Sequence, residues 1–106
     1  MDVLAVIVRP EQHMDIEELK KRAWDYVELE ARTKVISVEF LESFRLIGRD
    51  DAVFKVKTVD EEYPEWYVVG GDTPINLYST KQFNSADEAF SFHTGAMLRM
   101  MDRNYV

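Results

Sequence analysis

The sequence predicts a single α+β domain over residues 1–106, built as a two-layer sandwich with a mostly antiparallel sheet and two helices on one face. Two segments, 15–32 and 85–103, combine helical periodicity with helix start signals. The chain between them alternates apolar and polar residues at strand spacing and is interrupted by turn residues. We therefore expect the order β-α-β-β-β-(β)-α, and the length suits one hydrophobic core.

The first expected element is a strand over residues 3–8, VLAVIV. This run is continuously apolar and rich in β-branched residues, which is typical of a central strand covered on both faces. Arg9-Pro10 ends it, because proline cannot donate a hydrogen bond to a strand ladder.

The second element is a helix that begins after Asp15 and runs to about Arg32. Asp15 is a favourable N-cap, and Glu18 follows at the spacing of a capping box. Residues at helical spacing form one apolar face, which predicts a helix packed on a sheet. This face contains Ile16, Leu19, Ala23, Tyr26, Val27 and Ala31.

Strand periodicity takes over in residues 33–47, where apolar and polar side chains alternate. Glu42 falls on the apolar side of this pattern and predicts either a β-bulge or the end of the buried part of the strand. A short helix over residues 40–46 is the competing interpretation. Residues 48–51 are expected to form a turn, followed by a hairpin partner strand over residues 52–59.

A further strand is expected over residues 66–69, after the acidic turn 60–64. Gly70-Gly71 then breaks the strand, and residues 75–78 are expected to add a short extended segment. The final helix starts at a second capping box, with Ser85 as N-cap and Glu88 three residues later.

Composition and charge exclude several classes of function. The net charge is −7, with 20 acidic against 13 basic residues, which disfavours binding to nucleic-acid phosphates. No cysteine is present, so a disulfide framework, a thiol nucleophile and a thiolate metal site are excluded. No segment resembles a signal peptide or a membrane span, so we expect a cytoplasmic protein without membrane contact.

Aromatic and acidic residues concentrate around the predicted strand 66–69, and they suggest a surface for binding another protein, including a second copy of the chain. Strand alternation sends Trp66 and Tyr67 to opposite faces, so one of them is expected to point away from the helices. Tyrosine and tryptophan are common anchors at interfaces. The expected partner-binding residues are Asp60, Glu61, Glu62, Tyr63, Trp66 and Tyr67.

A small-ligand or catalytic pocket between the sheet and the last helix is the alternative. His93 lies on the apolar stripe of that helix, and Asp72, Asn76 and Tyr78 come from the loop that precedes it. A buried histidine with an orienting carboxylate or phenol can serve as a general base. A core histidine bonded to a neighbouring group is the competing interpretation of His93.

Motif searches favour the first of these two readings. Neither a phosphate-binding glycine loop nor GxSxG, HExxH or EF-hand spacing occurs, so we expect no catalytic residues, no metal and no cofactor. The sequence thus predicts a small acidic interaction module, such as an adaptor, assembly factor, regulatory subunit or inhibitor. An acidic mimic of nucleic acid that blocks a basic partner is a third possibility.

Overall fold

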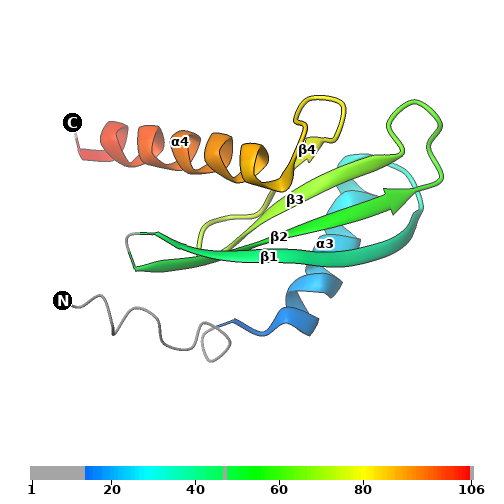
Figure 1. The fold of residues 1–106 in the computed structure, drawn as a ribbon, viewed down its shortest axis with the longest axis horizontal. Coiled ribbons are helices and arrows are strands. Elements are labelled where there is room, and N and C mark those ends of the chain that lie inside the picture. Colours follow the sequence, from blue (N-terminus) through cyan, green and yellow to red (C-terminus); the bar gives the residue numbers. More distant parts are fainter. Residues whose placement is uncertain (1–13, 47, 106) are drawn as a thin grey trace.

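The computed structural model of the protein describes residues 14–46 and 48–105. Its elements, in order, are α3 (Ile16–Glu30), β1 (Val35–Leu46), β2 (Arg49–Thr58), β3 (Glu65–Gly71), β4 (Asn76–Ser79) and α4 (Ala86–Tyr105) (Figure 1). The α+β class is confirmed. The strand predicted over residues 3–8 lies outside the described residues. Neither of the helices in the described chain is both long and apolar enough to cross a membrane.

The sheet is a meander in which each strand pairs with the next one along the chain. Its order is β1-β2-β3-β4, and all three pairings are antiparallel. The short segment expected near residues 75–78 is confirmed as β4, which makes this sheet four-stranded. The competing helix over residues 40–46 is wrong, because these residues continue the β1 ladder with β2.

The two helices cover opposite faces of the sheet, so the prediction that both lie on one face in two layers is wrong. Neighbouring residues of a strand point to opposite faces, and Val53 and Phe54 of β2 are both buried. In Figure 1, α3 lies behind the strands and α4 runs along the top of the view. Apolar side chains on both faces of β2 and β3 require a cover on each face, which gives three layers.

Each face has its own hydrophobic cluster. The α3 core contains Met14, Leu19, Ala23, Val27, Val35, Ala52, Phe54, Val56 and Val68. The α4 core is smaller and contains Val53, Tyr67, Val69, Tyr78 and Ala89. Phe90 of α4 adds a stacked contact with Phe44 of β1, with ring centroids 4.0 Å apart.

The predicted start signals of both helices are confirmed. The Asp15 carboxylate accepts a hydrogen bond from the Glu18 amide at 3.2 Å, and the Ser85 hydroxyl accepts one from the Glu88 amide at 3.2 Å. The first helix ends two residues before the predicted end near Arg32, because Arg32 adopts a left-handed backbone conformation with φ 55°. A left-handed residue cannot continue a right-handed helix.

The predicted irregularity at Glu42 is also confirmed. The register of β1 against β2 shifts between Phe40 and Glu42, so Leu41 is the extra residue of a bulge. The shift places Glu42 opposite Val53, which points to the face of the sheet that α4 covers. Glu42 itself stays exposed.

The turn predicted over residues 48–51 is shorter than expected, because β2 begins at Arg49. Two polar residues near the start of β2 are buried: Asp50 is 2% exposed and Asp51 is 5% exposed. Both form hydrogen bonds with residues elsewhere in the chain. Gly70 allows the backbone of β3 to lie very close to the backbone at Ile75, because a Cβ at this position would lie 2.5 Å from the Ile75 Cα. The β3–β4 loop therefore folds tightly against the end of β3.

Candidate functional site

A network of buried polar side chains connects β2, the β3–β4 loop and α4. Its centre is the Thr73 hydroxyl, which lies 3.0 Å from both carboxylate oxygens of Asp51 and 2.8 Å from Nε2 of His93. The Thr73 amide donates a further hydrogen bond to Asp51 Oδ1 at 3.0 Å. The loop that carries Thr73 is thereby fixed between the sheet and the helix.

The other ring nitrogen of His93 contacts β4. The Tyr78 hydroxyl lies 2.9 Å from Nδ1 of His93, and the Asn76 side-chain amide donates to the same hydroxyl at 3.4 Å. His93 is 0% exposed and Tyr78 is 7% exposed, whereas Asn76 lies at the surface. The network thus runs from an exposed amide to a buried carboxylate.

The direction of each hydrogen bond follows from the chemistry of the partners. An ionised carboxylate only accepts, so the single hydroxyl proton of Thr73 is donated to Asp51. The Thr73 oxygen then accepts from Nε2–H of His93, which leaves Nδ1 to accept from the Tyr78 hydroxyl. For a neutral ring, this pattern places the proton of His93 on Nε2.

Electrostatics favour the same protonation state. Burial lowers the pKa of His93 below its ordinary value of 6.5, and the nearby Asp51 carboxylate opposes this shift. Burial likewise raises the pKa of the Tyr78 hydroxyl, against the effect of the hydrogen bond from Asn76. Both ring nitrogens of His93 are occupied, so no lone pair is available to a substrate while the network is intact.

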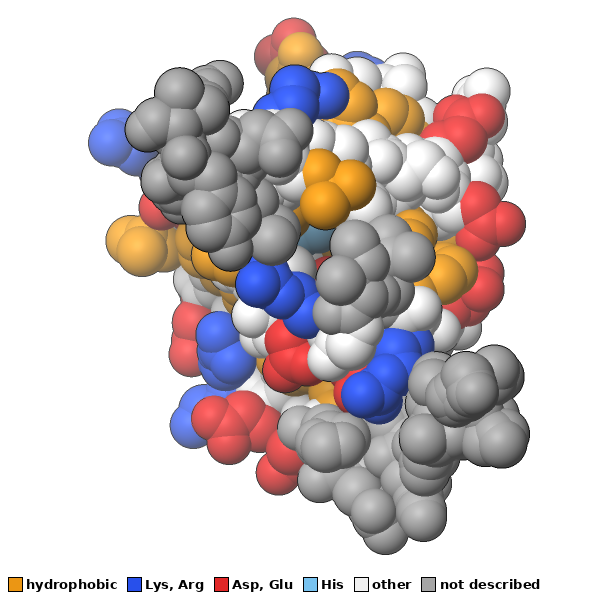
Figure 2. Space-filling view, turned by 90° about the vertical axis from the view of Figure 1, so that its left-hand side faces the viewer, with side chains coloured by type: hydrophobic (Ala, Val, Ile, Leu, Met, Phe, Trp, Pro, Cys, Tyr) orange, Lys and Arg blue, Asp and Glu red, His pale blue; other side chains and the backbone are white. Residues whose placement is uncertain are grey.

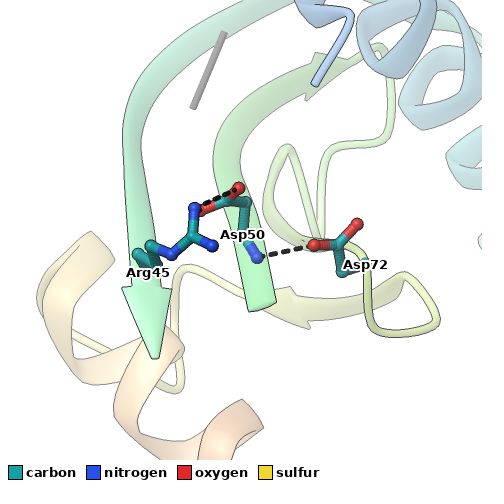
Figure 3. A network of polar contacts seen from close by, with 3 residues as sticks. All are labelled: Arg45, Asp50 and Asp72. Atoms are coloured by element: carbon teal, nitrogen blue, oxygen red, sulfur yellow. Dashed lines mark hydrogen bonds and ion pairs between the residues drawn. The ribbon is translucent and has the colours of Figure 1, made fainter. Parts of the chain in front are cut away.

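Asp72 takes part in a separate cluster (Figure 3). Arg45 of β1 points toward the carboxylate of Asp50, with Nη1 3.2 Å from Oδ2, and Asp50 donates its amide to Asp72 Oδ2 at 2.8 Å. The Asp72 amide in turn donates to the Asp50 carbonyl at 3.0 Å. The two aspartates join the start of β2 to the β3–β4 loop.

The structure thus brings together three of the four residues expected at the alternative pocket: His93, Tyr78 and Asn76. Asp72 is absent from this group, and Asp51 and Thr73 are the members that sequence reasoning missed. Alternation contained a signal for Asp51, because it lies two residues before Val53 and so on the same face of the strand. Because residues 48–51 were predicted to form a turn, Asp51 was not assigned to the strand that contains Val53.

The expected partner-binding residues divide between surface and core. Asp60, Glu61, Glu62 and Tyr63 form the turn before β3, and the Asp60 carboxylate accepts from the amides of Glu62 and Tyr63 at 2.8 and 3.0 Å. The hydrogen bond from the Tyr63 amide, followed by that from Glu62, lowers the pKa of Asp60. These hydrogen bonds lie within the turn and stabilise it.

The aromatic members are largely covered. Tyr67 is buried in the α4 core, and Trp66 is half-buried against the α3 core. Tyr63 is 40% exposed. The centroid of its ring lies 5.8 Å from that of Trp66 and 4.8 Å from the Lys81 ammonium. The expectation of an open sheet face at Trp66 or Tyr67 is not met, because the two helices cover both faces.

Comparison with known proteins adds no relative. No protein-family model matches the chain, and neither a curated protein nor a solved structure matches it. Within residues 14–46 and 48–105, no three His, Asp or Glu side chains are grouped closely enough to hold a metal ion.

Proposed function

We propose that the protein is a small cytoplasmic interaction module without catalytic activity, which binds another protein on what we term the α3–β1 surface. This surface comprises Trp24 of α3 and Val38 and Phe40 of β1. The observation that carries the proposal is a groove of about 540 Å³ between the helix and the strand, lined by Trp24 and Val38. Trp24 is 36% exposed and Phe40, the next residue on that face of β1, is 37% exposed.

The position of β1 in the sheet supports this proposal. It is an outermost strand of twelve residues, and among the described strands only β2 pairs with it. An edge strand can accept an extended segment of a partner through its free backbone groups, while neighbouring side-chain pockets provide specificity. A tryptophan beside such an edge is a typical interface anchor.

Charged and apolar residues share the lining of the groove. Glu17, Lys20, Lys21 and Asp25 line it together with the apolar residues, and both signs of charge are present. Interfaces between proteins usually combine apolar residues with polar and charged ones. It suits a protein partner, including a second copy of the chain, better than a polyanion.

The two other candidate functions have less support. A small-ligand or catalytic site at His93 requires an accessible ring nitrogen, and both are engaged in buried hydrogen bonds. A nucleic-acid mimic needs a surface of one charge sign, whereas acidic, basic and hydrophobic side chains are interspersed on the end of the molecule shown in Figure 2. We therefore place the function at the α3–β1 surface.

Substitution of Trp24 and Phe40 by alanine tests this proposal, with Leu29→Ala as the matched control. Leu29 is also on α3 but is 70% exposed and does not line the groove. Association is measured as solution mass over a concentration series at low and high salt, and as binding to displayed extended peptides. We expect Trp24→Ala to weaken the association it affects by roughly thirtyfold, the effect of an interface hot spot.

Two results would argue against the α3–β1 surface. If Trp24→Ala and Phe40→Ala leave every association unchanged while the circular dichroism spectrum is retained, this surface is not the binding site. If Tyr63→Ala alone abolishes binding, the acidic turn 60–63 is the site instead. Leu29→Ala is expected to behave like the unaltered protein in either case.

A further inference from the structure

Among the described residues, the hydrogen bonds of His93 are the main polar attachment of α4 to the rest of the fold. Thr73 and Tyr78, which contact the two ring nitrogens, lie on the β3–β4 loop and on β4. Apolar support comes from Ala89 in the α4 core and from Phe90 stacked on Phe44. Leu98 and Met100, in the later part of α4, are 39% and 49% exposed.

We propose that His93 is an acid-sensitive latch: a proton bound at Nδ1 breaks its hydrogen bond with Tyr78 and releases α4 from the sheet while α3 stays packed. In the closed state Nδ1 accepts from the Tyr78 hydroxyl. A protonated Nδ1 becomes a donor, so it no longer accepts the proton of the Tyr78 hydroxyl. This inference is independent of the proposed function, because the α3–β1 surface is on the other face of the sheet.

The described acceptor beside the new N–H is the Tyr78 oxygen, whose own proton is donated to Nδ1 in the closed state. The Tyr78 oxygen already accepts from the Asn76 amide at 3.4 Å. If it also accepts from Nδ1–H, its own proton must turn away from its only described acceptor. Protonation of His93 in the closed state therefore leaves the buried Tyr78 hydroxyl proton without its described acceptor, which is costly because buried polar groups need partners.

Other ionisable groups on this side of the molecule come from each element around α4. β2 contributes Asp51, which favours the protonated ring but is separated from it by the Thr73 hydroxyl. Tyr78 of β4 contacts the ring directly. The remaining groups on the same face of the sheet lie further along the strands, and they are Glu39 and Glu42 of β1, Lys55 and Lys57 of β2, and Glu65 and Tyr67 of β3. The helix α4 itself contributes Asp87, Glu88 and Arg99.

The direction of the pH effect follows from linkage. His93 binds a proton more weakly in the closed state than in the released state, where its pKa returns toward 6.5. Above about pH 6.5, His93 is therefore neutral in both states and the hydrogen bond from Tyr78 contributes its full stabilisation of the closed state. The equilibrium constant for release rises up to tenfold for each unit of pH below about 6.5, and it levels off once His93 is protonated in the closed state as well.

Release of α4 need not disturb the opposite layer. The α3 core is formed by residues of α3 and the other face of the sheet, and His93 is not among them. Both tryptophans report on that layer, because Trp24 is on α3 and Trp66 packs against the α3 core. Tryptophan emission is thus an internal control for the α3 side of the fold.

The test uses the full-length protein between about pH 8 and about pH 5, the range in which histidine titrates. Nitrogen-detected NMR gives the pKa and tautomer of His93, and hydrogen exchange gives the protection of α4 and α3 amides after correction for intrinsic exchange. We expect Nε2–H at high pH, and loss of α4 protection in acid at constant tryptophan emission. A His93 pKa at or above 6.5, or simultaneous loss of α3 and α4 protection, would overturn the proposal.

Two variants make the test specific. His93→Gln retains a donor and an acceptor but does not titrate, so its α4 protection should not change over this range; a response equal to that of the unaltered protein would refute the latch. His13→Gln, outside the described residues, is the matched control and should retain the acid response. Should His93→Gln not fold, Tyr78→Phe replaces it: loss of the donor to Nδ1 is expected to raise the pKa of His93 and weaken the acid response, and an unchanged pKa contradicts the mechanism.

Discussion

Replacement of Thr73 by valine removes the hydroxyl at the centre of the buried network. The substitution deletes the hydrogen bond to the Asp51 carboxylate, worth about 1.5–3 kcal/mol, because a charged partner is involved. It also leaves Nε2–H of His93 buried without an acceptor, at a cost of about 1–3 kcal/mol. We expect the free energy of unfolding to fall by about 3–5 kcal/mol, a large part of the roughly 5–15 kcal/mol typical of a small domain.

Urea denaturation at neutral pH measures this loss, and Thr58→Val provides the matched control. Thr58 is 5% exposed and Thr73 is 6% exposed, but the Thr58 hydroxyl contacts only backbone groups. Its replacement is expected to cost about 1 kcal/mol, as for a neutral hydrogen bond. If Thr73→Val is no more destabilising than Thr58→Val, at unchanged denaturant slope, the network does not stabilise the fold as argued.

The close backbone approach at Gly70 and the partly buried Arg45–Asp50 ion pair give two further predictions, both checked by thermal or urea unfolding. Gly70→Ala places a Cβ against the backbone of the β3–β4 loop and is expected to cost about 3 kcal/mol or to prevent folding, whereas Gly48→Ala, with open space at φ 73°, should cost about 1–2 kcal/mol. Equal losses would contradict the steric argument. Arg45→Met leaves the buried Asp50 carboxylate without its cation and is expected to cost about 3 kcal/mol, against less than about 1 kcal/mol for Lys20→Met in an exposed pair. A negligible effect of Arg45→Met would refute the importance of this pair.

Local signals in the sequence predicted most secondary structure correctly. Asp15 and Ser85 mark the helix starts because capping depends on a side chain and an amide only three residues away. The bulge before Glu42 was visible as an interruption of alternation within one strand. These features depend on near neighbours, so sequence reasoning could find them.

The candidate site was predicted only in part, because its members are far apart in the sequence. The burial of His93 followed from the apolar stripe of its helix, and Tyr78 was considered as a neighbour. Asp51 lies 22 residues from Thr73, and Thr73 lies 20 residues from His93, so no local period connects them. Their contact depends on how the β3–β4 loop folds over the end of the sheet.

The sequence by itself therefore determined the α+β class, the antiparallel strands, the helix starts and the buried position of His93. The tertiary structure decided which face each helix covers. Alternation shows that Val53 and Phe54 point to opposite faces, but it does not say which helix packs on each. That choice depends on the connections between elements, and the same choice brings α4 against Thr73 and leaves the edge of β1 beside Trp24.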